Sequence, residues 1–190
     1  EAMDKGLYQV IGAEIDDAYM VELKKQVIHP EIIKEVAEDI KIVYTPLCGT
    51  GNVPVRRVLK ELGFKNVYVV PEQENPDPKF TTLDYPNPED PKAFTYAINL
   101  AKEKDADIIL ATDPDADRLG VYAKDAKTGE YVAFTGNMSG MLIAEYLLRE
   151  KAKTGTMPAN PAMVTTIVTT NMTFPITEKY GVKLIEVLTG

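Results

Sequence analysis

The sequence predicts an α/β fold with a mixed, mainly parallel sheet that carries helices on both faces. Short apolar runs alternate with amphipathic segments along the chain, and glycine, proline and asparagine punctuate the junctions. Strands that alternate with helices in this way pair mainly in parallel, and helices cover the sheet. We therefore expect ligands to bind beyond the carboxyl ends of the strands.

The first half of the chain shows this alternation in order. The expected elements are a helix over 14–27, a helix from Pro30, a strand over 41–47, a helix that ends at Gly63 and a strand over 67–70. Apolar residues at helical spacing, a proline in the first turn and a glycine after the last turn indicate the helices. Six of the thirteen prolines lie between Pro71 and Pro91, which predicts an irregular loop.

The second half repeats the pattern with a hairpin inserted. The expected elements are a helix over 90–104, a strand over 108–111, a hairpin of 119–123 and 131–134 around 126–129, a helix over 138–151, a strand over 164–168, a helix over 171–179 and a strand over 183–188. Turn residues separate these elements, and the apolar runs are rich in β-branched side chains.

These elements predict three segments. Residues 1–39 form an N-terminal helical segment that leads from a missing first domain, 40–133 form the main α/β domain, and 134–190 form a truncated second α/β unit. The last strand runs directly into Thr189 and Gly190, which leaves an αβ unit half built. We therefore expect the chain to be a fragment of a longer protein.

Charge and composition exclude several classes of partner. The chain has 190 residues with 21 Lys or Arg and 29 Asp or Glu, so its formal net charge is −8, which argues against nucleic acid or an acidic membrane. No apolar run is as long as a membrane span, and the N-terminus does not resemble a signal peptide. The single cysteine, Cys48, fits a reducing compartment, so we expect a cytoplasmic protein in which Cys48 is a small buried residue.

The chain has one histidine, His29, and one serine, Ser139. Each lies at an expected helix start, where we interpret His29 as a surface residue and Ser139 as a helix cap. Nothing around them resembles a nucleophile elbow or a zinc site. A histidine-centred catalytic triad is therefore not predicted.

The most informative motif is Asp113-Pro114-Asp115-Ala116-Asp117-Arg118, directly after the apolar run 108–111. Three carboxylates at alternate positions repel each other unless a cation or a proton joins them, and Mg²⁺ takes such oxygen ligands. Arg118 offers a fork of donors for a phosphate or carboxylate, and Pro114 restricts the turn. The motif predicts a metal site with Asp113, Asp115 and Asp117 as ligands, facing a phosphorylated partner.

Other interpretations of this motif compete. Alternating acidic residues also occur in solvated turns. An EF-hand fails, because Arg118 would stand where that loop needs glycine and Lys124 where it needs glutamate. A haloacid-dehalogenase-type phosphatase opens with DxDx[TV], whereas Asp117 stands at the fifth position here. A non-catalytic α/β module that binds an anion or a partner is the alternative from another class.

A second turn, Gly49-Thr50-Gly51-Asn52, lies between a predicted strand and a predicted helix. Backbone N–H groups in such a turn can cradle an anion. The GxGxxG spacing and the acidic residue of a dinucleotide fingerprint are missing. A tight turn with Asn52 as the helix cap is the competing interpretation.

With these motifs, the chain resembles the α-D-phosphohexomutases, the phosphoglucomutase/phosphomannomutase family. The acidic loop, continued by Leu119-Gly120-Val121, looks like the metal-binding loop of that family. The other stretches similar to family segments are Thr45–Asn52, Pro71–Pro78 with Tyr85–Glu89, Phe134–Asn137 and Glu186–Gly190. The resemblance implies a phosphohexomutase domain II type of fold for 40–133 and a domain III-like half for 134–190.

The resemblance also implies a reaction, in which phosphate moves between C1 and C6 of a hexose phosphate through a phosphoserine and a bisphosphorylated sugar. Asp113, Asp115 and Asp117 would hold Mg²⁺, and a phosphoserine from another domain would complete its protein ligands. Arg118 would position the phosphate, while Thr189 and Gly190 would open a loop that approaches the sugar. The implied cofactors are Mg²⁺ and glucose 1,6-bisphosphate, and the implied partners are a hexose phosphate and the missing domains of the same polypeptide.

Departures from the family pattern limit what the chain can do alone. It has no TxSHNP phosphoserine loop, no GExSG sugar loop and no phosphate-binding fourth domain, and Cys48 replaces the usual histidine of the LHGTG segment. We therefore expect this fragment by itself to be inactive. The choice between glucose and mannose is not encoded here, because the deciding loop is absent.

Overall fold

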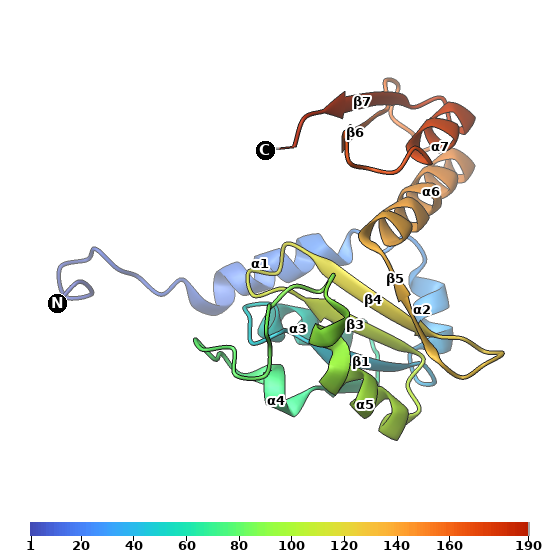
Figure 1. Cartoon of the computed structure of the whole chain (residues 1–190). Helices are drawn as coiled ribbons and strands as arrows, with labels where there is room; N and C mark the ends of the chain where they lie inside the picture. Colours follow the sequence, from blue (N-terminus) through green and yellow to red (C-terminus); the bar gives the residue numbers. More distant parts are fainter. Residues whose placement is uncertain (190) are drawn as a thin grey trace. The chain divides into compact units, whose positions relative to one another are not determined.

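The computed structural model describes residues 1–189 and has an α/β architecture (Figure 1). The chain divides into two compact units, Glu1–Leu119 and Gly120–Gly190, which we call unit 1 and unit 2. Among the described residues, no helix combines the length and the apolar character needed to cross a membrane.

The central feature is a five-stranded sheet with the order β2-β1-β3-β4-β5. β1 (Lys41–Thr45) pairs in parallel with both β2 (Asn66–Val69) and β3 (Ile108–Thr112). β4 (Leu119–Lys124) and β5 (Tyr131–Phe134) form the antiparallel hairpin that the sequence predicts. The predicted α/β fold with a mixed sheet is therefore confirmed.

Two helices connect the parallel strands of unit 1. α3 (Asn52–Glu61) leads from β1 outward to β2, and α5 (Thr95–Lys104) precedes the return to β3 on the other side of β1. Right-handed crossovers in opposite directions place their helices on opposite faces of a sheet. α5 packs against β1 and β3, and α1 (Gly12–Lys24) packs against α3.

The remaining helices of unit 1 are α2 (Pro30–Val36), α4 (Pro71–Glu74) and the 3₁₀-helix η1 (Pro91–Phe94). The helix expected over 90–104 therefore begins as a 3₁₀ turn, in which the Asp90 side chain accepts the N–H of Lys92 at 3.0 Å. The proline-rich stretch after β2 opens with the short helix α4, which the sequence did not predict.

The core of unit 1 lies around β1. Val43 and Tyr44 on this strand, Phe94 before α5 and Ile109 on β3 are all 0% exposed. A central parallel strand is covered on both faces, which is why the run 41–47 is almost continuously apolar. This packing gives the loops at the strand ends a rigid base.

Unit 2 contains most of the hairpin together with two helices and a second sheet. Its other elements are α6 (Gly136–Thr154), β6 (Ala162–Thr166), α7 (Thr173–Lys179) and β7 (Lys183–Val187). β6 and β7 pair in parallel, in register from Ala162 opposite Lys183 to Thr166 opposite Val187. The two-stranded sheet agrees with the expected second α/β unit.

The strand predicted over 164–168 is displaced by two residues. β6 ends at Thr166, because the chain turns there and the N–H of Thr169 donates to the Thr166 carbonyl at 2.9 Å. Ile167 and Val168, whose apolar side chains suggested a continuing strand, are exposed.

Two predicted helix caps are wrong. The N-terminus of α6 is capped by Thr135, whose hydroxyl accepts the N–H of Met138 at 3.2 Å, so Ser139 lies inside the first turn. Asn52 makes no cap at α3 and instead donates from its side-chain amide to the Glu74 carbonyl at 2.8 Å. Thr135 thus takes the cap position predicted for Ser139, whereas the N-cap position of α3 is Gly51, with no side-chain cap.

Candidate metal centre

The loop between β3 and β4 brings three carboxylates together. Asp113 is buried, with 7% of its surface exposed, whereas Asp115 and Asp117 are exposed. One oxygen from each of the three lies within 4.8 Å of the others. The loop starts at the carboxyl end of β3, where open α/β sheets bind their ligands.

Hydrogen bonds within the loop fix its conformation around Asp113. The N–H of Arg118 donates to Asp113 Oδ1 at 2.9 Å, and the N–H of Ala116 donates to the Asp113 carbonyl at 3.0 Å. Ala116 has a φ of 61°, in the left-handed region that is unfavourable for a residue with a Cβ atom. The loop therefore closes as a tight turn around its buried carboxylate.

The guanidinium of Arg118 lies over these carboxylates. Its Nε atom is 3.6 Å from Asp113 Oδ2 and 3.8 Å from Asp117 Oδ1, and the side chain is 52% exposed. Ion pairs this long and this exposed are weak, so the side chain can turn toward another anion at little cost. The predicted ligands and the predicted phosphate-positioning arginine thus share one short loop.

The crowding of like charges raises the pKa of Asp117 above its ordinary value. The main cause is a hydrogen bond with the carboxyl group of Asp113, the negative charge of Asp115 adds to it, and Arg118 opposes it. A proton on Asp117 relieves the repulsion between the carboxylates, which is why the pKa rises. A divalent cation at the same place would relieve that repulsion more fully.

The donor set fits a hard divalent cation. All three side chains offer oxygen, and neither histidine nor cysteine joins the cluster. Oxygen ligands favour Mg²⁺, Ca²⁺ or Mn²⁺, whereas zinc and copper prefer nitrogen and sulfur. Three carboxylates leave coordination positions for water and a phosphate oxygen, the arrangement that Mg²⁺ usually adopts.

The turn after β1 lies directly against this loop. The N–H of Thr50 donates to the Pro114 carbonyl at 2.8 Å, and the N–H of Gly49 donates to Pro46 at 2.9 Å. Both N–H groups are therefore engaged within the protein, which favours the tight turn over an anion cradle. Sequence reasoning gave Thr50 no role here, because 64 residues separate it from Pro114; the signal was that both segments follow neighbouring parallel strands.

Cys48 lies in the same turn and is 6% exposed, as the sequence predicts for a packed residue. Burial raises the pKa of its thiol, which keeps it protonated and unreactive near neutral pH. Cys48 therefore supports the turn and contributes no atom to the acidic cluster.

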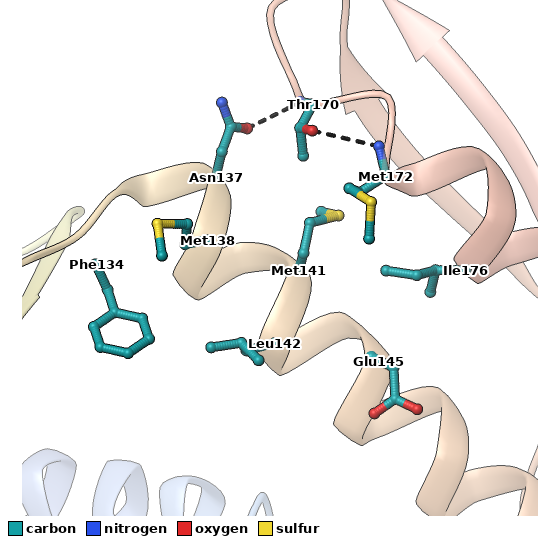
Figure 2. A pocket seen from close by; sticks show the side chains of 9 residues that line it. All are labelled: Phe134, Asn137, Met138, Met141, Leu142, Glu145, Thr170, Met172 and Ile176. Carbon is teal, nitrogen blue, oxygen red and sulfur yellow. Dashed lines mark hydrogen bonds between the residues drawn. The ribbon is translucent and has the colours of Figure 1, made fainter. Parts of the chain in front are cut away.

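Unit 2 has a hollow of a different chemical character (Figure 2). Its volume is about 500 Å³, and it is lined mainly by apolar side chains, among them Met138 and Met141 of α6 and Met172 directly before α7. Its acidic residue, Glu145, accepts a hydrogen bond from Tyr180 at 2.7 Å and pairs with Arg149 at 3.0 Å. Because this carboxylate is already satisfied, the hollow offers no metal site.

Thr189 and Gly190 are the residues that the sequence predicts to contact the sugar. Thr189 follows β7 and is exposed. Gly190 lies outside the described residues. Thr189 does not belong to the unit that carries the acidic loop.

Comparison with protein families gives two matches that together cover most of the chain. The family described as "Phosphoglucomutase/phosphomannomutase, alpha/beta/alpha domain II" matches residues 17–129. The corresponding domain III family matches residues 135–190. The acidic loop falls within the first match, and the hollow of unit 2 falls almost wholly within the second.

Three similar proteins are phosphomutases by name. A probable phosphomannomutase of Haemophilus influenzae is 36% identical over 184 residues, which cover 96% of this chain and 35% of that protein. A phosphoribomutase of Saccharomyces cerevisiae is 38% identical, covering 77% of this chain and 24% of its own length. A phosphoglucomutase of Staphylococcus aureus is also 38% identical, covering 80% and 27%. The chain therefore spans about a third or less of these relatives.

Solved structures show the same fold. A putative phosphomannomutase from Thermus thermophilus superposes with a TM-score of 0.69 at 21% identity, over 93% of this chain and 36% of that one. An N-acetylglucosamine-phosphate mutase in its substrate complex gives a TM-score of 0.58 at 19% identity, over 92% and 33%.

Proposed function

The chain belongs to the phosphoglucomutase/phosphomannomutase family, and on that premise we propose that its acidic loop is the Mg²⁺ site of a phosphohexomutase. The whole enzyme would interconvert hexose 1-phosphate and hexose 6-phosphate, with glucose or mannose as the sugar. The observation that carries the proposal is the approach of the Asp113, Asp115 and Asp117 carboxylates to within 4.8 Å of one another.

Each residue of the loop has a role in this proposal. Asp113, Asp115 and Asp117 would bind Mg²⁺ through one oxygen each, and a phosphoserine from another domain would supply a further oxygen. The ion that these residues would hold would neutralise the charge that develops on a phosphoryl group during transfer. Arg118, whose guanidinium is half exposed beside the carboxylates, would turn to the phosphate and hold it by paired hydrogen bonds.

The chain would supply only part of the enzyme. It spans 35% of the length of the Haemophilus influenzae relative. We assign 1–39 to a segment that leads from a first domain, 40–133 to the domain with the metal loop and 134–190 to part of a third. Other domains of the same polypeptide would supply the phosphoserine and the phosphate clamp. Thr189 and Gly190 would approach the sugar. The enzyme would work in the cytoplasm with glucose 1,6-bisphosphate as activator and intermediate.

A Mg²⁺ titration followed by backbone amide shifts tests the metal assignment. Residues 113–118 should respond first, and binding should be weak because water fills the shell in the absence of the phosphoserine. Asp115→Asn should abolish the response. Asp16→Asn removes an exposed carboxylate from α1 and serves as the matched control, so it should leave the response unchanged. Small shifts scattered over the whole acidic surface would contradict a specific site.

A coupled assay tests the assignment to a larger mutase. With glucose 1-phosphate, Mg²⁺ and catalytic glucose 1,6-bisphosphate, this chain should show no turnover, because phosphoryl transfer depends on positioning and the carrier and clamp are elsewhere. In the full-length parent, Asp115→Asn should sharply reduce turnover with the fold retained. Mutase turnover by the isolated chain would refute the assignment. Phosphatase turnover lost in Asp113→Asn would favour a haloacid-dehalogenase-type enzyme instead.

A further inference from the structure

The turn after β1 makes closer contact with the acidic loop than a simple connection requires. Both the N–H and the hydroxyl of Thr50 donate to one acceptor, the carbonyl oxygen of Pro114, at 2.8 and 3.0 Å. Pro114 separates two of the proposed metal ligands, Asp113 and Asp115. A side chain on one loop thus fixes the peptide plane that links two carboxylates on another.

Two glycines on either side of Thr50 allow this approach. A Cβ atom at Gly49 would overlap Pro114 Cα and lie 2.5 Å from the Pro114 carbonyl oxygen. A Cβ atom at Gly51 would lie 2.5 Å from Thr112 Oγ1 and 2.7 Å from the Tyr44 hydroxyl. Neither glycine has a positive φ, so glycine is needed here for space and not for a left-handed backbone.

Buried contacts fix the start of the turn. Leu47 and Cys48 both have left-handed backbones, with φ of 46° and 63°, and both are buried. The N–H of Cys48 donates to the Gln73 carbonyl at 2.9 Å, and the hydroxyl of Thr45 donates to the Gln73 side chain at 2.7 Å. A strained turn persists when its surroundings over-determine it, and these contacts do so.

One buried hydrogen bond joins the two strands from which both loops start. The Tyr44 hydroxyl on β1 and Thr112 Oγ1 on β3 lie 2.8 Å apart. Gly51 covers this pair from the turn, and Asp113 follows Thr112 directly. The turn, the two strands and the acidic loop are therefore joined through consecutive packed groups.

We propose that Thr50, with Gly49 and Gly51, is a positioning clamp that holds the acidic loop in its metal-binding conformation. The proposal rests on the function proposed above and extends it to a residue outside the acidic motif. In this role Thr50 would contact neither the metal nor the substrate. It acts through Pro114, whose fixed carbonyl keeps the Asp113 and Asp115 carboxylates at the separation that a cation requires.

Thr50→Val tests the hydroxyl with little change in shape. The variant loses the hydroxyl bond to the Pro114 carbonyl and keeps the backbone N–H bond. This loss should weaken Mg²⁺ binding by this chain about threefold to tenfold, the range expected for one hydrogen bond. Thr50→Ser, which keeps the hydroxyl, should restore most of the affinity. Thr95→Val is the matched control, because it removes a hydroxyl bond of the same kind, from Thr95 to the Lys92 carbonyl at 2.8 Å.

A second readout needs no metal. Hydrogen exchange of the Ala116 and Arg118 amides, which both bond to Asp113, should be faster in metal-free Thr50→Val and unchanged in Thr95→Val. Thermal unfolding of the two variants should shift equally, which separates positioning from general stability.

The two readouts distinguish failure of the clamp from failure of the metal site. Unchanged amide exchange in Thr50→Val, or faster exchange with unchanged Mg²⁺ affinity, would overturn the clamp. If the unmodified chain does not bind Mg²⁺ and exchange still responds, the contact of the clamp with the loop stands and the Mg²⁺ assignment falls. Weaker binding together with faster exchange supports both.

Discussion

Unit 1 and unit 2 are built from the same kinds of element but bury their apolar residues to different extents. In unit 1, Val43, Phe94 and Ile109 are 0% exposed. In unit 2, Ile176 and Val182 are among the most buried apolar side chains and keep 8% and 7% exposure. The difference shows that the acidic loop belongs to the unit with the more completely closed core.

The strands of unit 2 show the same contrast. β6 and β7 pair in parallel, and parallel strands are normally covered on both faces. Val164 on β6 is 62% exposed and Leu188 after β7 is 78% exposed, so the described part of unit 2 leaves apolar surface uncovered. Large exposed apolar surfaces mark interaction sites in soluble proteins.

The contrast bears on the proposed metal site. Metal ligands must be held within a fraction of an ångström, which requires a rigid base and supporting hydrogen bonds. The loop on unit 1 has both, in β1, β3 and the Thr50 contact. The methionine-lined hollow of unit 2 has flexible side chains that adapt to what they contact (Figure 2).

The largest expected effect comes from truncating one large apolar side chain in each unit. Phe94→Ala should cost unit 1 about 3–5 kcal/mol, because it empties a fully buried site. Leu142→Ala in α6 should cost unit 2 less than about 1 kcal/mol, because that side chain is 59% exposed. Native-state hydrogen exchange measures each unit separately through the amides of β1 and α6. Equal losses in the two units would break the comparison.

Smaller changes in stability are expected from two glycine substitutions, one of which should destabilise unit 1 while the other stabilises unit 2. Gly49→Ala should destabilise unit 1 by about 1–3 kcal/mol, because the new Cβ atom collides with the backbone of Pro114. Gly140→Ala in α6 meets nothing within 4 Å and should stabilise unit 2 by about 0.5–1 kcal/mol through helix propensity. Denaturant unfolding of each variant measures both changes. A neutral Gly49→Ala would show that the turn and the acidic loop can separate freely.

Local features of the structure could be predicted from the sequence, whereas the contacts around these glycines could not. Periodicity and turn residues predicted the α/β fold and the order of its elements, because each depends on local pattern. The position of the acidic loop at a strand end followed from the apolar run before it. The contact of Thr50 with Pro114 could not be predicted, because 64 residues separate the two. Predicting it would have required the pairing register of β1 and β3, the strands that precede them.

Errors in the prediction have local physical causes. Ile167 and Val168 extend an apolar run past the end of β6, and the turn from Thr166 to Thr169 overrides that pattern. At α6, Thr135 and Ser139 are both polar residues near the helix start, and the structure selects Thr135 because its hydroxyl reaches the N–H of Met138. Side-chain geometry within one turn of a helix decides such cases.

The smallest expected effect concerns two carboxylates whose pKa values move in opposite directions. The pKa of Asp117 is raised, because Asp113 shares a hydrogen bond with it and Asp115 repels it. The pKa of Glu145 in unit 2 is lowered, mainly because the Tyr180 hydroxyl donates to it. Asp117 in unit 1 is thus repelled by neighbouring carboxylates, whereas Glu145 in unit 2 is stabilised as a carboxylate by a hydrogen-bond donor.

The two carboxylates should therefore give opposite pH dependences of stability. Asp117 binds its proton more tightly in the folded state, so its contribution is present below the unfolded pKa and is lost as pH rises through the raised folded value. Glu145 releases its proton more readily when folded, so its contribution is present above the unfolded pKa and is lost as pH falls through the lowered value. Carboxyl NMR titration measures both pKa values, and Asp117→Asn and Glu145→Gln should remove the respective slopes.

Saturating Mg²⁺ should lower the pKa of Asp117 and leave that of Glu145 unchanged, because a cation takes the place of the shared proton in the acidic loop alone. A pKa of Asp117 at or below its ordinary value in the metal-free protein would mean that the three carboxylates lie farther apart in solution than the structure places them.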